Sequence, residues 1–507
     1  MSQIQNRQQR TLTSLLDGLM DDDRGALPDI AEDVIGLSSD SRTVQPGSLY
    51  LACAGEQQHG LDYIEDAVSA GAVAVAWEPD KRYPNGPGSI TRQLPTVAVS
   101  NLQHKVGVIA DRFYGHPSQQ MNVIGITGTN GKTSCSHYLA QVLSADHDQC
   151  GVIGTLGYGI YGRLQTASHT TPDAITLQSQ LAQMLQASVQ HVVMEVSSHG
   201  LDQGRVNGMN FTMAVLTNLS RDHLDYHTNE SAYAAAKQIL FDWPGLSWRI
   251  LNLDDAFGRA LLSKQDVPCL GYGFGADISK ATEFFVSGSA LRTSADGLAF
   301  HIDTHMGQAE ISSKLLGRFN ASNLLAVIAV LLSLGYTLEV LVKRLANVQA
   351  VAGRMERFSA AGKPLLVVDY AHTPDALRVA LEAAREHITG KLWCVFGCGG
   401  DRDRGKRSMM AAVAEQLADH VTLTDDNPRN EDAELIIKDI QSGLVRPEQV
   451  RVIHDRASAI KAVFEQASVD DLILVAGKGH EDYQLIGNQR LPYSDRETVV
   501  KLLGGKC

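Results

Sequence analysis

Short runs of apolar residues alternate along the chain with amphipathic segments, and glycine-rich turns separate them. The runs HVVMEVSS from His191 and LILVAGKGH from Leu472 have the length and the valine, isoleucine and leucine content of buried strands. The segment DALRVALEAA from Asp375 has the spacing of a helix that buries one face. Strands that alternate with helices predict parallel sheets covered by helices. The pattern therefore predicts an α/β fold.

Three blocks of this pattern divide the chain. Its 507 residues exceed what one hydrophobic core ordinarily holds, and the length suggests about three domains. The breaks in the pattern predict an N-terminal domain at 1–105, a central domain at 106–350 and a C-terminal domain at 351–507. We expect a sheet flanked by helices in each, a Rossmann-like C-terminal domain, and ligands at the carboxyl ends of the strands.

Composition and charge narrow the class of protein. Hydrophobic residues make up 44% of the chain and charged residues 20%, as in ordinary globular proteins. The net charge of -13 argues against a surface for nucleic acid or anionic membrane. The most apolar run, LLAVIAVLLSLG from Leu324, is too short to cross a bilayer and predicts a buried helix. Any anionic ligand must therefore be bound in a local pocket.

Cysteine usage predicts a reducing compartment. The seven cysteines are scattered and odd in number, and they lack the paired spacing of a metal site. Cys394 and Cys398, in CVFGC, indicate a buried strand end. The N-terminal segment before the acidic run at Asp21 carries no apolar stretch of signal-peptide length. We therefore expect a cytoplasmic protein.

The segment GITGTNGKTS carries the clearest chemical signal, because an apolar strand runs into a glycine-rich turn and then a helix. The turn offers phosphate oxygens the backbone N–H groups of Gly128, Thr129, Asn130 and Gly131. Lys132 adds a positive charge, and the Thr133 hydroxyl can bind magnesium. The segment departs from the usual phosphate loop at Ile126, where that motif has glycine. The predicted ligand is a nucleoside triphosphate.

Polar side chains follow two further strands of the central block. Glu195 ends HVVME, and His223 lies in NLSRDHLDYH together with Asp225 and His227. Carboxylate and imidazole groups bind divalent cations, so these strand ends predict a site for metal or phosphate. Lys237, in YAAAKQILF, by itself indicates a solvated lysine on an amphipathic helix.

The segment TLTDDNPRNEDAE places carboxylates, an amide, a proline and an arginine after the strand HVTL. Pro428 fixes its own φ and restricts Asn427, so Arg429 is held in one direction. Alone, such a segment indicates a solvated surface turn. Its place at a strand end makes it a candidate ligand site.

Ten segments occur in order along the chain, within a resemblance that runs from about Ser39 to the C-terminus: TGTNGKTS, TTPD, EVSSHGLDQGR, NLSRDHLDYH with YAAAK, GRFNASN, GRMERF, DYAHTPD, GCGGDRDRGKR, DDNPR and GKGHEDYQ. Together they closely resemble the Mur ligases, and among these the ligases that add the third residue of the peptidoglycan peptide. The resemblance implies an ATP-dependent ligase that joins meso-diaminopimelate to UDP-N-acetylmuramoyl-L-alanyl-D-glutamate through an acyl phosphate. We expect a monomer that binds small molecules, and neither nucleic acid nor membrane.

The resemblance also implies roles around ATP. Lys132, Lys237 and His223 match catalytic positions. Two Mg²⁺ ions would be bound by Thr133, Glu195, His223 and Lys237, with Lys237 as a CO2-derived carbamate, which turns a cation into a metal-binding anion. ATP would be bound by the phosphate loop from Gly128 to Thr133 and by Asn320, Asn323, Arg354, Asp369 and His372. Those positions require the C-terminal domain to close onto the central one, with the expected hinge near Gly353.

Two further sets match the other substrates. The precursor would be bound by Ser41, Gln57, Thr170, Thr171, Ser197, Gln203 and Arg205. Without the family, loop capping is the simpler interpretation of Ser41, Gln57 and Thr170. His169 stands where many relatives carry asparagine. The incoming amino acid would be bound by Arg402, Asp426, Asn427, Arg429, Gly477 and Glu481.

Arg429 would select the amino acid. Its guanidinium can bind the extra carboxylate of diaminopimelate with two charge-assisted hydrogen bonds, whereas it would repel the ammonium of L-lysine. Glu481 matches an acid that pairs with a substrate ammonium.

Three alternatives stay open. A lysine-adding Mur ligase would differ at Arg429. An enzyme like folylpolyglutamate synthetase would share the phosphate loop, although TTPD, DNPR and GKGHE argue against it. A nucleotide-binding switch or scaffold would hydrolyse ATP slowly without ligation. Whether ATP turnover requires both the precursor and the amino acid separates this last alternative from the ligases.

Overall fold

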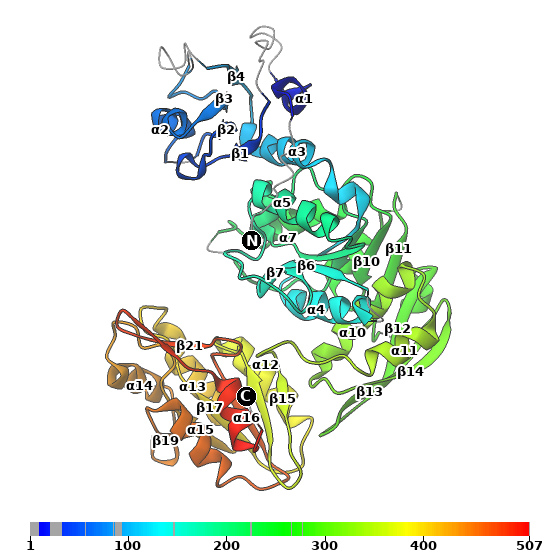
Figure 1. The fold of residues 1–507 in the computed structure, drawn as a ribbon. Coiled ribbons are helices and arrows are strands. Elements are labelled where there is room, and N and C mark those ends of the chain that lie inside the picture. The colour runs from blue at the N-terminus through cyan, green and yellow to red at the C-terminus, as the bar shows by residue number, and fades with distance from the viewer. Residues whose placement is uncertain are drawn as a thin grey trace. The chain divides into compact units, whose positions relative to one another are not determined.

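The structure is a computed structural model that describes residues 10–20, 33–55, 57–84, 86, 94–145, 148–223, 226–264, 266–275 and 277–505. The chain divides into two compact units, one of Met1–Ile250 and Asp255–Cys269, the other of Leu251–Asp254 and Leu270–Cys507. Both units combine sheets with flanking helices (Figure 1). The predicted α/β fold class is confirmed.

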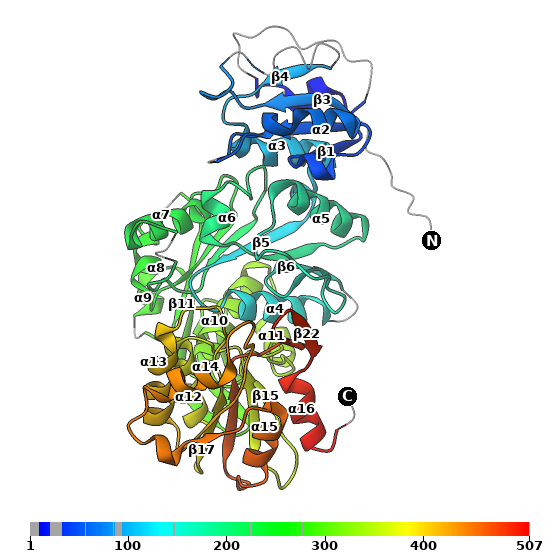
Figure 2. The same cartoon turned by 90° about the vertical axis from the view of Figure 1, so that its left-hand side faces the viewer.

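The first unit begins with a small parallel sheet in the order β1-β2-β3-β4. Its strands are β1 (Gly36–Ser38), β2 (Ser48–Ala52), β3 (Ala72–Trp77) and β4 (Thr96–Ala98). Because side chains alternate along a strand, Leu49 and Leu51 pack with α1 (Leu12–Leu16) and α3 (Leu102–Tyr114), while Tyr50 and Ala52 pack with α2 (Ile64–Ser69). The sheet and these helices can be followed in Figure 2.

The larger sheet of the first unit has the strand order β10-β9-β5-β8-β6-β7. Its strands are β5 (Asn122–Thr127), β6 (Cys150–Gly154), β7 (Gly157–Ile160), β8 (His191–Glu195), β9 (Met213–Leu216) and β10 (Trp248–Asn252). Its helices are α4 (Lys132–Leu143), α5 (Ala174–Gln186), α6 (Ser198–Asp202), α7 (Glu230–Phe241) and α8 (Ala256–Leu261). Parallel pairing of β5 with β8 and β9 brings the carboxyl ends of these three strands to one edge.

The second unit opens with strands in the order β14-β13-β12-β11. These are β11 (Cys269–Gly273), β12 (Phe284–Ser294), β13 (Gly297–Thr304) and β14 (Gly307–Ser313), followed by α10 (Arg318–Ser333) and α11 (Leu338–Leu345), with the short α9 (Ile278–Ala281) after β11. Helix α10 is buried along LLAVIAVLL, as predicted. The antiparallel hairpins β12-β13-β14 were not predicted, because the prediction used continuous apolar runs with helices between them. These strands instead alternate buried and exposed positions, and they follow one another without a helix.

The last sheet has the order β15-β16-β20-β17-β18-β19, with β15 antiparallel and the others parallel. Its strands are β15 (Glu356–Phe358), β16 (Leu365–Asp369), β17 (Leu392–Phe396), β18 (His420–Leu423), β19 (Arg451–Val452) and β20 (Leu472–Ala476). One face packs against α12 (Pro374–Arg385), α13 (Gly405–Leu417) and α14 (Ala433–Gln441). The other packs against α15 (Arg456–Phe464) and α16 (Asp495–Leu502). Hairpin β21 (Tyr483–Ile486) and β22 (Gln489–Pro492) lies outside this sheet.

The prediction for the segment CVFGC is also confirmed. Cys394 and Cys398 are buried at the end of β17. In the described ranges, no helix combines the length and the apolar character needed to span a bilayer.

Candidate functional site

The phosphate-loop segment leaves the buried strand β5 and enters α4 through two left-handed glycines, Gly128 and Gly131, with φ of 147° and 87°. A Cβ on Gly128 would lie 1.9 Å from Thr217 Oγ1, so only glycine fits there. The Thr129 N–H donates to the Asn218 carbonyl at 2.9 Å, and the Asn130 N–H donates to Asn218 Oδ1 at 3.0 Å. Two of the four expected phosphate donors are therefore used within the protein here.

Two lysine side chains converge on this loop. Lys132 Nζ and Lys237 Nζ both donate to the Gly128 carbonyl, at 2.8 and 2.9 Å. Lys237 is 1% exposed, which corrects the interpretation of a solvated lysine, because α7 packs its inner face onto the loop. Burial, and then the nearby Lys132, lower the pKa of the Lys237 ammonium to about 6.

A buried hydroxyl and carboxylate lie beside the loop. Thr133 Oγ1 donates to Glu195 Oε2 at 2.9 Å, and Glu195 is fully buried at the end of β8. Thr155 holds both oxygens of Glu195, its N–H at 2.9 Å from Oε1 and its hydroxyl 3.2 Å from Oε2. Hydroxyl and carboxylate oxygens suit a hard divalent cation. Together with Lys237, the structure thus brings three of the four predicted metal ligands to the phosphate loop, and two of them, Thr133 and Glu195, are hydrogen-bonded to each other.

His223 has a left-handed backbone conformation, with φ of 52°, and its ring centroid lies 5.0 Å from that of His199. The His227 ring is 5.5 Å from His199, and its Nε2 is 3.0 Å from Ser198 Oγ. Asp225 lies outside the described residues. Among the residues that are described, no three His, Cys, Asp or Glu side chains form a ready metal site.

A cavity of about 710 Å³ lies in the first unit and brings segments from far apart in the sequence together. Ser41, Gln203 and Arg205 line it, while Gln57 does not, although its neighbour Gln58 does. The cavity is also lined by Tyr50 and His59, which no sequence pattern singled out.

The other predicted precursor residues connect the cavity to Glu195. Arg205 donates to Gln203 Oε1 at 2.6 and 2.9 Å and to the Thr171 carbonyl at 2.9 Å. The buried Thr171 hydroxyl donates to the Glu195 carbonyl at 3.0 Å and lies 3.1 Å from Ser197 Oγ. Thr170 meets Thr155, at 3.0 Å between hydroxyls. His169 is exposed, with Nδ1 3.0 Å from Ser168 Oγ.

The second unit holds the remaining nucleotide candidates in two groups. Asn320 and Asn323 are buried at the start of α10, with Asn323 Nδ2 donating to Asn320 Oδ1 at 3.0 Å. The Arg354 guanidinium lies 4.7 Å above the Tyr370 ring, and its buried Nε has no hydrogen-bond partner among the residues that the structure describes. An orphaned buried donor of this kind fits a ligand oxygen.

Asp369 and His372 lie on either side of Tyr370. Asp369 accepts the N–H groups of Met355 and Ala371 at 2.7 and 2.8 Å, and burial raises the pKa of its carboxyl group. His372 Nδ1 is 2.7 Å from the Tyr370 carbonyl, and burial lowers the pKa of its ring.

The turn Asp425–Asn430 is largely buried, unlike the solvated turn that its composition alone indicates. Asp426 is 7% and Asn427 3% exposed. A Cβ on Gly477, whose φ is 117°, would lie 2.7 Å from Asp426 Oδ2, so glycine permits this approach. Asn427 Nδ2 donates to Glu481 Oε2 at 3.0 Å.

Arg429 has a left-handed backbone, with φ of 52°, and hairpin β21-β22 holds it there. Its N–H donates to the Leu485 carbonyl at 3.0 Å, and its carbonyl accepts the Gly487 N–H at 2.7 Å. Its Nη1 donates to the Gly400 carbonyl at 2.8 Å. A Cβ on Gly399 would approach Arg429 Nη1 at 2.7 Å and Arg402 Cγ at 3.8 Å, so the two arginines lie close together. All six predicted amino-acid residues thus gather around one turn.

Fold and sites define a phosphate-loop nucleotide-binding protein whose second unit carries a cluster of polar side chains at the strand ends of a parallel sheet. The chain belongs to the Mur ligase family. Three stretches match that family: residues 33–114 match the description "Mur ligase family, catalytic domain", 126–331 "Mur ligase middle domain" and 353–479 "Mur ligase, glutamate ligase domain".

Curated relatives are similar over nearly the whole chain. A protein of Ectopseudomonas mendocina named UDP-N-acetylmuramoyl-L-alanyl-D-glutamate--2,6-diaminopimelate ligase is 51% identical, over 90% of this chain and 93% of its own length. The protein of the same name from Alkalilimnicola ehrlichii is 50% identical over 92% of this chain and 94% of its own.

Solved structures of related proteins have a similar fold. A structure of a ligase of that same name has a TM-score of 0.72 at 36% identity, covering 92% of this chain and 94% of the other. Folylpolyglutamate synthase of Mycobacterium tuberculosis has a TM-score of 0.56 at 20% identity, over 73% of this chain and 91% of the other, and shares the fold alone.

Proposed function

We propose that this chain is an ATP-dependent ligase that joins meso-diaminopimelate to the D-glutamate γ-carboxylate of UDP-N-acetylmuramoyl-L-alanyl-D-glutamate, a step of peptidoglycan precursor synthesis. The names of relatives about half identical to it support this function. The observation that carries it is the largely buried turn Asp425–Asn430, which carries Arg429 and, through Asn427, binds Glu481, because an amino acid with two carboxylates needs a guanidinium as well as an acid. We further propose a cytoplasmic monomer that acts on small molecules.

Three parts would share the work. Residues 1–105 would bind the uridine end of the precursor, residues 106–350 would bind ATP, and residues 351–507 would bind the amino acid and close over ATP. The four-stranded sheet falls within the first range and the six-stranded sheet within the third, which supports the division.

Activation of the carboxylate is the chemical problem, since an amine cannot expel oxide from it. Transfer of the γ-phosphoryl group of ATP to a carboxylate oxygen would give an acyl phosphate and ADP. The amine would then attack the acyl carbon and lose a proton, phosphate would leave, and an amide bond would form. Lys132 and the phosphate-loop N–H groups would stabilise the negative charge on the transferring oxygens.

Thr133, Glu195, His223 and Lys237 would hold two Mg²⁺ ions, which supply charge neutralisation on the phosphate oxygens. The Thr133–Glu195 pair fits such an ion. Lys237 would act as a carbamate, since a lysine whose pKa lies near 6 is largely an unprotonated amine at neutral pH, and only that form reacts with CO2. An added anion at this position also fits a site in which the described carboxylates and histidines are too few.

The remaining residues would position substrates. Asn320, Asn323, Arg354, Asp369 and His372 would bind adenine, ribose and phosphates, and the orphaned Arg354 Nε supports this role. Ser41, Thr170, Thr171, Ser197, Gln203 and Arg205 would bind the precursor along the cavity and the chain of hydrogen bonds to Glu195. Gln57, beside the cavity residue Gln58, would also bind the precursor. Arg402, Asp426, Asn427, Arg429, Gly477 and Glu481 would form the amino-acid pocket.

Phosphate release from ATP tests the proposal. Purified protein is mixed with the precursor and with meso-diaminopimelate, L-lysine or no amino acid in parallel. Release that requires diaminopimelate is the expected result. Preference for lysine would keep the ligase and remove Arg429 as the selector, whereas release without any amino acid would indicate a nucleotide hydrolase.

A further inference from the structure

We infer that Lys478 is a positioning residue of the amino-acid pocket, a buried ammonium that orients Asn427 and Glu481 toward the incoming substrate. The inference rests on the proposed function, because it concerns the amino-acid pocket of that ligase. Lys478 lies between Gly477 and Glu481 in the sequence, and neither its type nor its spacing singled it out.

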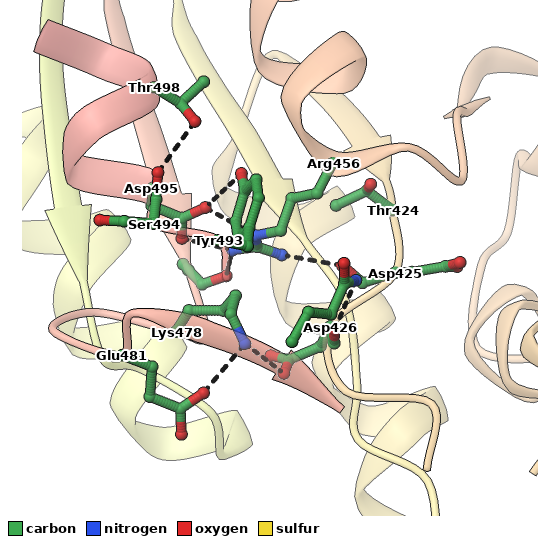
Figure 3. A network of polar contacts seen from close by, with 12 residues as sticks. Thr424, Asp425, Asp426, Arg456, Lys478, Glu481, Tyr493, Ser494, Asp495 and Thr498 are labelled. Carbon is green, nitrogen blue, oxygen red and sulfur yellow. Dashed lines mark hydrogen bonds and ion pairs between the residues drawn. The ribbon is translucent and has the colours of Figure 1, made fainter. Parts of the chain in front are cut away.

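The side chain of Lys478 is fully buried directly after β20, with 0% exposed. An ammonium without partners in such a place would cost several kcal/mol. Its Nζ donates to Glu481 Oε2 at 2.9 Å and to Asn427 Oδ1 at 3.0 Å, and it lies 3.7 Å from Asp426 Oδ1. Figure 3 shows it between Glu481 and Asp426. Its polar partners thus all belong to the proposed pocket.

The contact with Lys478 sets which way the Asn427 amide faces. Oδ1 accepts from Lys478 Nζ and from the Leu485 N–H at 2.9 Å, while Nδ2 donates to Glu481 Oε2. A flipped amide would turn its NH2 group toward an ammonium and an N–H, so donors would face donors, and its oxygen toward a carboxylate. The Lys478 ammonium therefore favours one of the two orientations of the Asn427 amide.

The same contact selects one oxygen of Glu481. Lys478 and Asn427 both bind Oε2, which leaves Oε1 outside this pair of hydrogen bonds. The Glu481 side chain is 16% exposed, so it can be reached from solvent while its rear oxygen is held. A carboxylate held by one oxygen can offer the other to a substrate ammonium without reorienting.

The charges around Lys478 also support this role. Asp426 and Glu481 formally carry two negative charges against one on Lys478, so the three groups leave one negative charge for a substrate ammonium. The other buried cation nearby, Arg456, is already paired, because it donates to both oxygens of Asp495 at 2.8 Å. Burial raises the pKa of the Asp426 carboxyl group, and Arg456 and Lys478 oppose that rise. Removal of Lys478 would take away the ammonium that lies 2.9 Å from Glu481 and 3.7 Å from Asp426.

A merely structural lysine would be expected to bind scaffold residues. Arg456 shows this pattern in the same sheet, since it binds Asp495 at the start of α16 and the Ala476 carbonyl at the end of β20. Lys478 instead binds Asn427 and Glu481, two side chains proposed to touch the amino acid.

Steady-state kinetics of three variants test the inference. Lys478→Met keeps length and removes charge, Lys478→Gln keeps a donor without charge, and Lys478→Arg keeps the charge. We expect Lys478→Met to raise the KM for diaminopimelate at least tenfold and to change the KM for ATP and for the precursor less than twofold. Lys478→Gln should follow it with a smaller rise, and Lys478→Arg should recover part of the loss. Lys461→Met, at an exposed ion pair with Glu465, serves as the matched control and should behave as wild type.

The outcomes distinguish a failure of the proposed function from a failure of the inference about Lys478. If wild type releases no phosphate with diaminopimelate, the proposed function fails before the variants are compared. If wild type does and a folded Lys478→Met has an unchanged KM for diaminopimelate, or raises all three KM values together, the inference alone is overturned. Should Lys478→Met not fold, Lys478→Gln decides by the same criteria.

Discussion

The phosphate loop and the turn Asp425–Asn430 both gather cationic side chains, but these side chains find their hydrogen-bond partners in opposite ways. At the loop, Lys132 and Lys237 both donate to the neutral carbonyl of Gly128, and Lys132 donates to that of Thr129 as well. At the turn, Arg456 and Lys478 each bind a carboxylate at 2.8 to 2.9 Å. A buried ammonium on a neutral dipole loses its proton more readily, whereas one paired with a carboxylate keeps it.

The difference teaches how a ligand site can be distinguished from its scaffold. Lysine side chains that hydrogen-bond to neutral carbonyls, as at the loop, can bind the negative charge of an incoming phosphate or be modified. Cations that already bind carboxylates mainly orient their neighbours. Four measurements can break or sharpen this contrast, in order of decreasing effect.

Lys237→Ala is expected to reduce turnover by roughly 10²- to 10³-fold, the scale of losing a group that stabilises a phosphoryl transition state. Short carboxylates added to the assay should restore part of it, since they can replace the carbamate oxygens. Lys280→Ala, at an exposed pair with Asp277, is the control and should leave the rate unchanged. Full activity of Lys237→Ala would remove this lysine from the reaction.

Arg456→Met should lower the free energy of unfolding by about 3–5 kcal/mol, because it leaves Asp495 buried without its partner. Both side chains are 0% exposed. Arg490→Met breaks an exposed pair with Asp482 and should cost less than about 1 kcal/mol. Urea denaturation of the two variants measures both values, and equal losses would contradict the scaffold role of Arg456.

Arg429→Ala should raise the KM for diaminopimelate by roughly 10²-fold, the scale of a lost charge-assisted pair in a pocket. The KM for ATP should stay close to that of wild type. Arg446→Ala, at an exposed pair with Glu415, provides the matched comparison. An unchanged KM for diaminopimelate would exclude Arg429 from the pocket.

Substitution of His454 should have the smallest effect, a pH-dependent change in the free energy of unfolding. Its Nδ1 lies 2.9 Å from Asp425 Oδ1 and its Nε2 3.1 Å from Glu434 Oε1, and the first of these raises the pKa of the ring. A raised folded pKa stabilises the protein below the unfolded pKa near 6.5, and this gain is lost as pH rises through the folded value. Because the ring is 37% exposed, His454→Gln should cost at most about 1 kcal/mol at pH 5.5 and nothing at pH 8.5. Denaturation at both pH values checks this, and a larger loss at pH 8.5 would reverse the sign.

Local patterns predicted the strand-loop-helix of the phosphate site, the buried strands β8, β16, β17 and β20, and the buried helix α10. They failed where a residue depends on distant partners. Lys237 has the sequence of a solvated position, and only its packing on Gly128, 109 residues away, buries it. Tyr50 and His59 line the 710 Å³ cavity because the fold brings them to Gln203 and Arg205, which lie far along the chain.

The sequence by itself determined the α/β class, the phosphate loop and the residue types of the turn Asp425–Asn430, since strand and helix periods and short motifs are set by neighbouring residues. Only the tertiary structure decided which charges are paired. Arg456 meets Asp495 across 39 residues, and Lys478 meets Asn427 across 51. Electrostatic interaction depends on distance and burial in space, and a linear order of residues specifies neither until the sheet has folded.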